Sequence, residues 1–130
     1  MRVTTAKQLM YESDTLKRML GLLSDENIYL KNKVTEILRT YFDQSLLEEI
    51  ELFNNRFVRE DILISLLRSD IAEMDDLLLK ETFENVKAPG EIERNFRLIR
   101  NNVLNAEMQF EILKKDFAIY ISEIYNPKWK

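Results

Sequence analysis

The feature that most constrains the fold of this chain is an apolar heptad repeat that continues for about thirty residues in each of three stretches. Residues at intervals of seven lie on one face of an α-helix, and a second apolar position between them completes a seam. A helix of this kind cannot bury its seam alone. The sequence therefore predicts an all-α bundle of long helices.

The three seams follow directly from the spacing of the apolar residues. The first runs through Leu9, Leu16, Leu23, Leu30 and Ile37, with Leu20, Val34 and Tyr41 between them. The second comprises Leu46, Ile50, Phe53, Phe57, Ile64, Leu67, Ile71, Met74 and Leu78. The third comprises Ile92, Phe96, Ile99, Val103, Ala106, Phe110, Leu113, Phe117, Tyr120 and Ile124. We expect the most buried residues to include Phe57, Ile64, Ile99, Val103 and Phe110.

Composition supports one helical domain. Hydrophobic residues make up 45% and charged residues 32% of the 130 residues, a balance typical of a folded, soluble protein. Only two glycines and two prolines are present, so few chain reversals are available. Turn-rich β architectures need such residues at every reversal, and we therefore exclude them.

Charge and cysteine content limit the partners that we expect. The net charge of −4 argues against general binding to nucleic acid or to anionic lipid, because both need a concentrated positive face. The chain has no cysteine, and its apolar runs are far too short to span a membrane. Residues 1–5 lack the apolar segment of a secretory signal. We expect a cytoplasmic protein.

Capping signals divide the chain into helices over about 4–42, 45–86 and 91–125. Thr4 or Thr5 can cap the first helix, and Ser45 with Glu48 resembles a capping box at the start of the second. The segment 87–90 contains the only Pro-Gly pair, and Asn126-Pro127 ends the third helix. The short links force neighbouring helices to run antiparallel, so we expect an antiparallel three-helix bundle.

An alternative interpretation breaks the first helix near Gly21–Ser24. Cations followed by Gly21 resemble a helix end, and Ser24 could cap a new helix, which would give a four-helix bundle. The heptad keeps its phase through this site, however, and a break has no reason to preserve it. We therefore favour an unbroken helix.

The sequence offers few residues for catalysis. Without histidine or cysteine there is no Ser-His-Asp triad and no thiolate, and the two isolated glycines form no phosphate-binding loop. Adjacent acidic residues on a helix diverge by about 100°, so such pairs do not converge on a metal ion. We expect no enzyme activity, cofactor or metal. Glu60 lies on a seam, and we expect it to pair with a cation or to extend to the edge of the bundle.

Two polar residues interrupt the first seam. Ser13 and Asn27 occupy the position that Leu20 and Val34 fill elsewhere. A buried Asn in such a seam can fix the register and the number of helices at some cost in stability. We therefore consider Ser13 and Asn27 candidate register-setting residues, although Asn27 would lie in the first turn of a new helix if the chain broke at Gly21–Ser24.

Surplus apolar residues are the strongest indication of function. A second stripe lies outside the seams, and its members are Val58, Ile62 and Leu66 on the second helix and Leu104, Met108 and Ile112 on the third. A three-helix monomer has no further layer to cover them, and soluble monomers rarely expose large apolar patches. The sequence thus predicts a non-catalytic interaction or scaffold protein that binds itself, as a homo-oligomer, or another protein.

A rival hypothesis uses the basic residues of the third helix. Arg94, Arg97 and Arg100 give a local positive patch, which would suit a small regulatory or nucleic-acid-associated factor. Acidic neighbours at Glu91 and Glu93 dilute this charge. Nucleic-acid binding is therefore the less favoured function.

Overall fold

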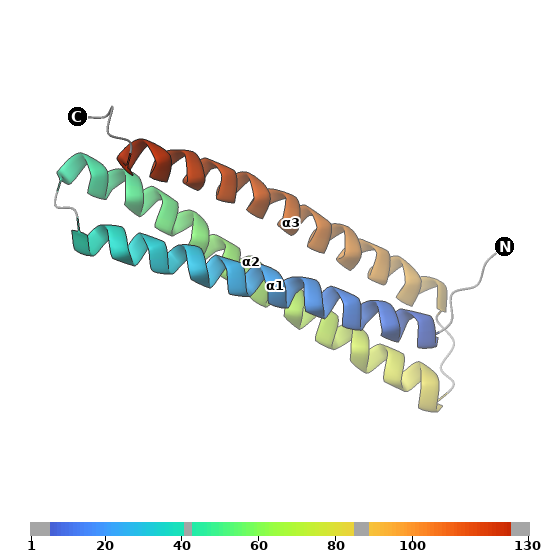
Figure 1. The fold of residues 1–130 in the computed structure, drawn as a ribbon. Coiled ribbons are helices and arrows are strands. Elements are labelled where there is room, and N and C mark those ends of the chain that lie inside the picture. Colours follow the sequence, from blue (N-terminus) through green and yellow to red (C-terminus); the bar gives the residue numbers. More distant parts are fainter. Residues whose placement is uncertain (1–5, 41–42, 85–88, 126–130) are drawn as a thin grey trace.

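The protein consists of three long α-helices. The structure, a computed structural model, describes the backbone of residues 6–40, 43–84 and 89–125, and side chains at positions 7–40, 43–80 and 90–124. The helices are α1 (Ala6–Thr40), α2 (Gln44–Glu84) and α3 (Pro89–Tyr125), with 35, 41 and 37 residues respectively (Figure 1). The prediction of an all-α bundle of three long helices is confirmed.

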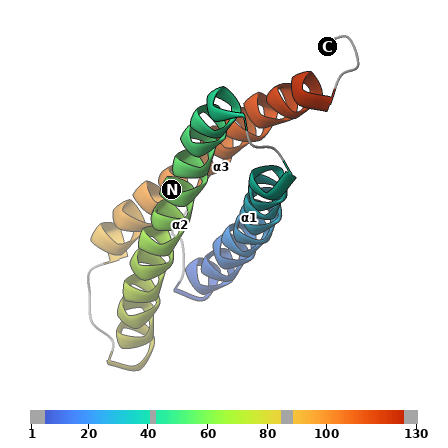
Figure 2. The ribbon, with the colours of Figure 1, turned by 90° about the vertical axis from the view of Figure 1, so that its left-hand side faces the viewer.

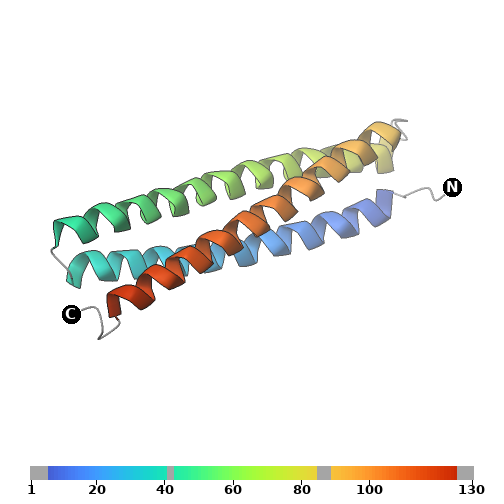
Figure 3. The ribbon, with the colours of Figure 1, turned by 90° about the horizontal axis from the view of Figure 1, so that it is seen from above.

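The helices run up, down and up along a common axis. At about 1.5 Å per residue, each helix is roughly 50–60 Å long. The molecule is therefore elongated, and the start of α1 and the end of α3 lie at opposite ends of the bundle (Figures 1 and 2). α3 crosses the pair formed by α1 and α2 at an oblique angle (Figure 3).

The first helix is continuous through Gly21, which excludes the four-helix alternative. Gly21 and Ser24 both lie inside α1. The seam residues on both sides, Leu16, Leu20 and Leu23, are buried in the same core, so packing outweighs the local stop signal. A Cβ atom added at Gly21 would meet no atom within 4 Å. No close approach of another helix requires glycine at this position.

The predicted cap of the second helix is wrong by two residues. Asp43, rather than Ser45, is the N-cap: its Oδ1 accepts a hydrogen bond from the Ser45 backbone N–H at 2.9 Å. Its backbone oxygen accepts the first helical bond, from the Leu47 N–H at 3.0 Å. Asp and Ser are both good caps, and the anionic side chain also complements the positive end of the helix dipole.

The other predicted boundaries agree to within two residues where they can be compared. α3 begins at Pro89 instead of residue 91, because proline lacks only an N–H that the first turn leaves unused. α3 ends at Tyr125, just before the predicted stop at Asn126-Pro127. Thr4, Thr5 and the ends of the first two predicted helices, at residues 42 and 86, lie outside the described residues.

The three seams meet in one core. All five residues expected to be most buried are buried, and Phe57, Val103 and Phe110 are completely so. Leu30, Phe53 and Ile124 are only partly buried at the edge of the core. Tyr41 lies outside the described residues. The predicted seams are therefore assigned to the correct faces.

Aromatic rings join α2 to α3 near the start of α2. The ring of Phe117 lies edge-on to those of Phe57 and Phe53, with centroids 5.1 and 5.3 Å away. Phe53 also contacts Tyr120, at a centroid distance of 5.0 Å. These contacts fix the axial register of α3 against α2.

Candidate interaction surface

The six residues of the predicted outer stripe are all exposed. Their side chains are between 41% and 64% accessible, although each is large and apolar. Burying one such side chain stabilises a protein by about 1.5–3 kcal/mol. The surface therefore holds a substantial driving force for association.

The outer stripe extends over more than one side of the bundle. Leu66 lines a groove between α2 and α3, and Ile112 lies seven residues after Asn105, which lines the same groove. These two residues therefore share the side of the bundle where α2 meets α3. Ile62 and Met108 lie one turn from them, on the outermost positions of their helices.

The other two residues of the stripe are turned toward α1. Val58 lies one turn before Asp61, and Asp61 binds Lys31 of α1. Leu104 lies one turn after Arg100, and Arg100 binds Glu12 of α1. Val58 and Leu104 therefore flank the α1 contacts of two different helices. The structure does not bring all six predicted residues into one patch.

The α2–α3 side exposes further apolar residues besides the six of the predicted interface. Leu52, Leu98 and Ile119 are 65%, 60% and 56% exposed. Leu52 precedes Leu66 by two heptads, while Leu98 and Ile119 lie two heptads before and one heptad after Ile112. The heptad spacing alone could have identified them. We call the side formed by Leu52, Leu66, Leu98, Ile112 and Ile119 the α2–α3 face.

A groove of about 520 Å³ runs along the middle of the α2–α3 face. Its cause is Ala106, which occupies a seam position that Ile99 and Leu113 fill one heptad away. The small side chain leaves a hollow between the helices. The lining residues are Arg56, Arg59, Glu60, Leu63, Leu66, Leu67 and Asp70 of α2, with Asn102, Asn105, Ala106, Gln109 and Leu113 of α3.

Glu60 lies at this groove and is buried, with only 6% of its surface exposed. Its Oε1 atom has no hydrogen-bond partner among the described residues. Burial, assisted by the negative charge of Asp61, raises the pKa of the Glu60 carboxyl to about 6. Glu60 forms no ion pair among the described residues, so the expectation that it pairs with a cation is wrong; its side chain lines the groove at the edge between α2 and α3. The nearby cation Arg56 binds Asp116 of α3 instead.

The polar residue Asn27 is buried and bonded to α2. Its Nδ2 donates to the backbone oxygen of Phe57 at 3.0 Å and to Oδ1 of Asp61 at 2.7 Å. Lys31, one turn later, binds the other oxygen of Asp61. Because α1 is continuous, Asn27 does not lie in the first turn of a new helix.

Ser13 forms the same arrangement two heptads earlier. Its hydroxyl donates to Oδ1 of Asp75 at 2.5 Å, and Lys17 binds the other oxygen of Asp75 at 2.5 Å. The hydrogen bond to Asp75 raises the pKa of Lys17. The two polar clusters are equally spaced on α1 and α2, so a slip of one heptad between these helices would leave both unpaired.

The arginine patch of the third helix is only partly available for binding. Arg100 forms an ion pair with Glu12 of α1 and lies 6.0 Å from the centre of the Phe96 ring. Arg94 and Arg97 are exposed. Among the described residues, no group of three or more acidic side chains could hold a metal ion.

No protein-family model matches this chain, and neither a curated protein nor a solved structure matches it. None of the helices in the described part of the chain is long and apolar enough to cross a membrane.

Proposed function

We propose that this chain is a non-catalytic interaction protein that associates through the apolar outer faces of its helices. The supporting observation is the number of large apolar side chains that the bundle leaves accessible, above all on α2 and α3. Core formation does not require them, since the seams are already buried against one another. Association removes such surface from water and is favoured for that reason.

Leu66 is the residue at which this proposal is tested most cleanly. It is 59% exposed and lies outside the core, so Leu66→Glu should leave the helical content unchanged. In an interface, the same substitution would desolvate an unpaired charge and weaken association. Ser69→Glu is the control, because exposed Ser69 lies on the same helix three residues later but outside the α2–α3 face.

The measurement is molecular mass by sedimentation equilibrium over a range of concentrations, followed by capture of binding proteins with the same variants. We expect Leu66→Glu to lose binding that the wild type and Ser69→Glu retain. If the wild type binds neither itself nor another protein, the proposal fails. If Leu66→Glu unfolds, the stripe belongs to the core and the proposal also fails.

A further inference from the structure

We propose that the partner on the α2–α3 face is a second copy of this chain, with the two α2 helices packed antiparallel about a two-fold axis. This inference rests on the proposed function and adds to it the identity, orientation and register of the partner. Its basis is a second heptad pattern on α2, next to the core seam, that is complementary to itself when one copy is reversed.

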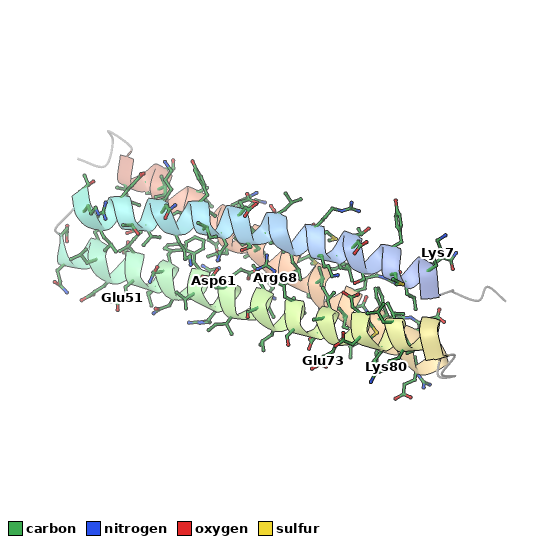
Figure 4. The ribbon with its side chains drawn as sticks, turned by 90° about the horizontal axis from the view of Figure 1, so that it is seen from below. Lys7, Glu51, Asp61, Arg68, Glu73 and Lys80 are labelled. Atoms are coloured by element: carbon green, nitrogen blue, oxygen red, sulfur yellow. The ribbon has the colours of Figure 1, made fainter. Side chains whose placement is uncertain are left out.

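The edge of α2 that carries this second pattern can be located from its heptad positions, named a to g. With Phe57 at position a and Glu60 at position d of the core seam, positions g and c lie on the edge of α2 beside α3. Arg56, at g, binds Asp116 of α3 at 3.0 Å, and this ion pair shows that the g edge of α2 faces α3. Asp61 and Arg68, at position e, lie instead next to α1, and Figure 4 shows them on the edge of α2 opposite to Glu73 and Lys80.

The g and c positions form a seam of their own. Each c residue follows a g residue by three, the spacing of a and d in a coiled coil. When two copies of one helix run antiparallel, each g position therefore meets a c position of the other copy. The c residues in chain order are Leu52, Arg59, Leu66, Glu73 and Lys80. The g residues in reverse order are Leu77, Asp70, Leu63, Arg56 and Glu49.

These two series are complementary at every position. Leucine meets leucine twice, and each of the other three pairs joins a cation to a carboxylate, as Arg59 does with Asp70. The two-fold axis repeats every pair. A shift of one heptad in one direction sets Glu73 against Glu49, and a shift in the other sets Lys80 against Arg56. Only one antiparallel register satisfies the whole edge.

Three charged residues of this edge are available for the second copy. Among the described residues, Arg59, Asp70 and Glu73 form no ion pair within the protomer. Arg59 and Asp70 are eleven residues apart, about 16 Å along the helix, and cannot reach each other in one protomer. Arg56 already binds Asp116, but a guanidinium has five N–H donors and can serve a second carboxylate.

Apolar residues elsewhere on the α2–α3 face fit the same axis. A hollow of about 310 Å³ lies between Leu52, Phe53 and Tyr120. Because Leu52 pairs with Leu77 in this register, the Leu77 side chain of the second copy would lie at this hollow. The axis crosses α2 between Leu63 and Leu66. Phe53 contacts Tyr120 and Phe57 contacts Phe117, which shows which residues of α3 lie beside which residues of α2. At the height of the two-fold axis, the neighbouring part of α3 is therefore near residue 108.

Leu98 and Ile119 lie almost equally far on either side of that level. The two-fold axis therefore brings Leu98 of one copy beside Ile119 of the other, and both are exposed in the protomer. Two independent sets of residues, on α2 and on α3, thus specify one axis. The groove at Glu60 becomes enclosed between the copies.

Charge reversal tests the pairing, with sedimentation equilibrium as the readout. Arg59→Asp sets a new carboxylate against Asp70, and Asp70→Arg sets a new guanidinium against Arg59, so each variant alone should weaken the dimer by roughly a hundredfold or more. A mixture of the two variants should form a heterodimer, because both of its pairs are again opposite in charge. The double variant should likewise form a homodimer. Arg68→Asp, on the α1 edge of the same helix, is the matched control and should remain dimeric.

The outcomes distinguish this inference from the proposed function. Recovery of the dimer in the mixture establishes the pairing of Arg59 with Asp70. A wild-type dimer that neither reversal weakens overturns the register and leaves association through another face. A wild type that stays monomeric at all concentrations overturns the self-pairing, and the proposed function then depends on a different protein. Circular dichroism of each variant verifies that the protomer remains folded.

Discussion

Glu60→Gln should gain stability relative to the wild type as the pH rises from acid to neutral and alkaline values. The substitution keeps the shape of the side chain and abolishes its charge. Burial raises the pKa of Glu60 from 4.5 to about 6, so the folded state holds the proton more tightly than the unfolded state. The wild-type residue therefore contributes most to stability below about pH 4.5, and that contribution is lost as the pH rises through about 6.

The size of the effect follows from the difference between the two pKa values. A difference of about 1.5 corresponds to about 2 kcal/mol between the protonated and ionised forms. The free energy of unfolding of Glu60→Gln, less that of the wild type, should thus increase by about 2 kcal/mol between about pH 4 and about pH 8. The buried amide of Glu60→Gln also needs hydrogen-bond partners, at a site where Oε1 of Glu60 has none among the described residues. Because an amide does not titrate, this requirement shifts the difference by an amount that does not depend on pH.

Urea unfolding followed by circular dichroism measures this difference at several pH values. Protein concentration is held fixed, because association stabilises the folded state by mass action. Other titrating groups are common to both proteins and cancel in the comparison. A difference that is constant with pH, or that decreases as pH rises, would refute the reasoning that Glu60 is desolvated at the groove.

Three further variants test the fold. Phe110→Ala should lower the free energy of unfolding by about 3–5 kcal/mol, through lost burial and the cavity left behind; a loss under about 1 kcal/mol would mean that the seam of α3 faces elsewhere. Gly21→Ala should raise stability by about 1 kcal/mol, because the site is helical and open; destabilisation would contradict an unbroken α1. Ser13→Leu with Asn27→Leu should preserve helicity but allow more than one register, seen as extra amide signals in NMR spectra. A single set of signals would show that the two polar clusters do not set the register.

The helices and the core could be predicted because they depend on a repeat that extends over many residues. Phe57 and Phe110 are buried as the heptad requires, and the phase of the seam correctly outweighed the local stop signal at Gly21. The cap of α2 was misplaced because Asp43 and Ser45 are both competent, and only the local backbone decides between them.

The candidate surface was predicted only in part because it depends on how the helices are rotated and offset. Exposure of Ile62 and Leu66 follows from the seam alone. The groove does not, since it needs Ala106 of α3 to lie beside Glu60 of α2, and this depends on their axial register. Nor could the seam show that Val58 and Leu104 flank α1 contacts while Leu66 and Ile112 share the α2–α3 face.

The antiparallel dimer is tested most directly by distances between spin labels on the two copies. The chain has no cysteine, so Glu48→Cys or Ser69→Cys gives one exposed label per protomer outside the proposed interface. In the proposed register, the two labels at position 48 lie about 50 Å apart along the helix axis, and those at position 69 about 14 Å apart. Pulsed electron paramagnetic resonance should therefore give a long distance for the first and a short one for the second. Equal distances at the two positions would indicate parallel helices, and the absence of dipolar coupling between labels would show that no dimer forms; either result would contradict the account.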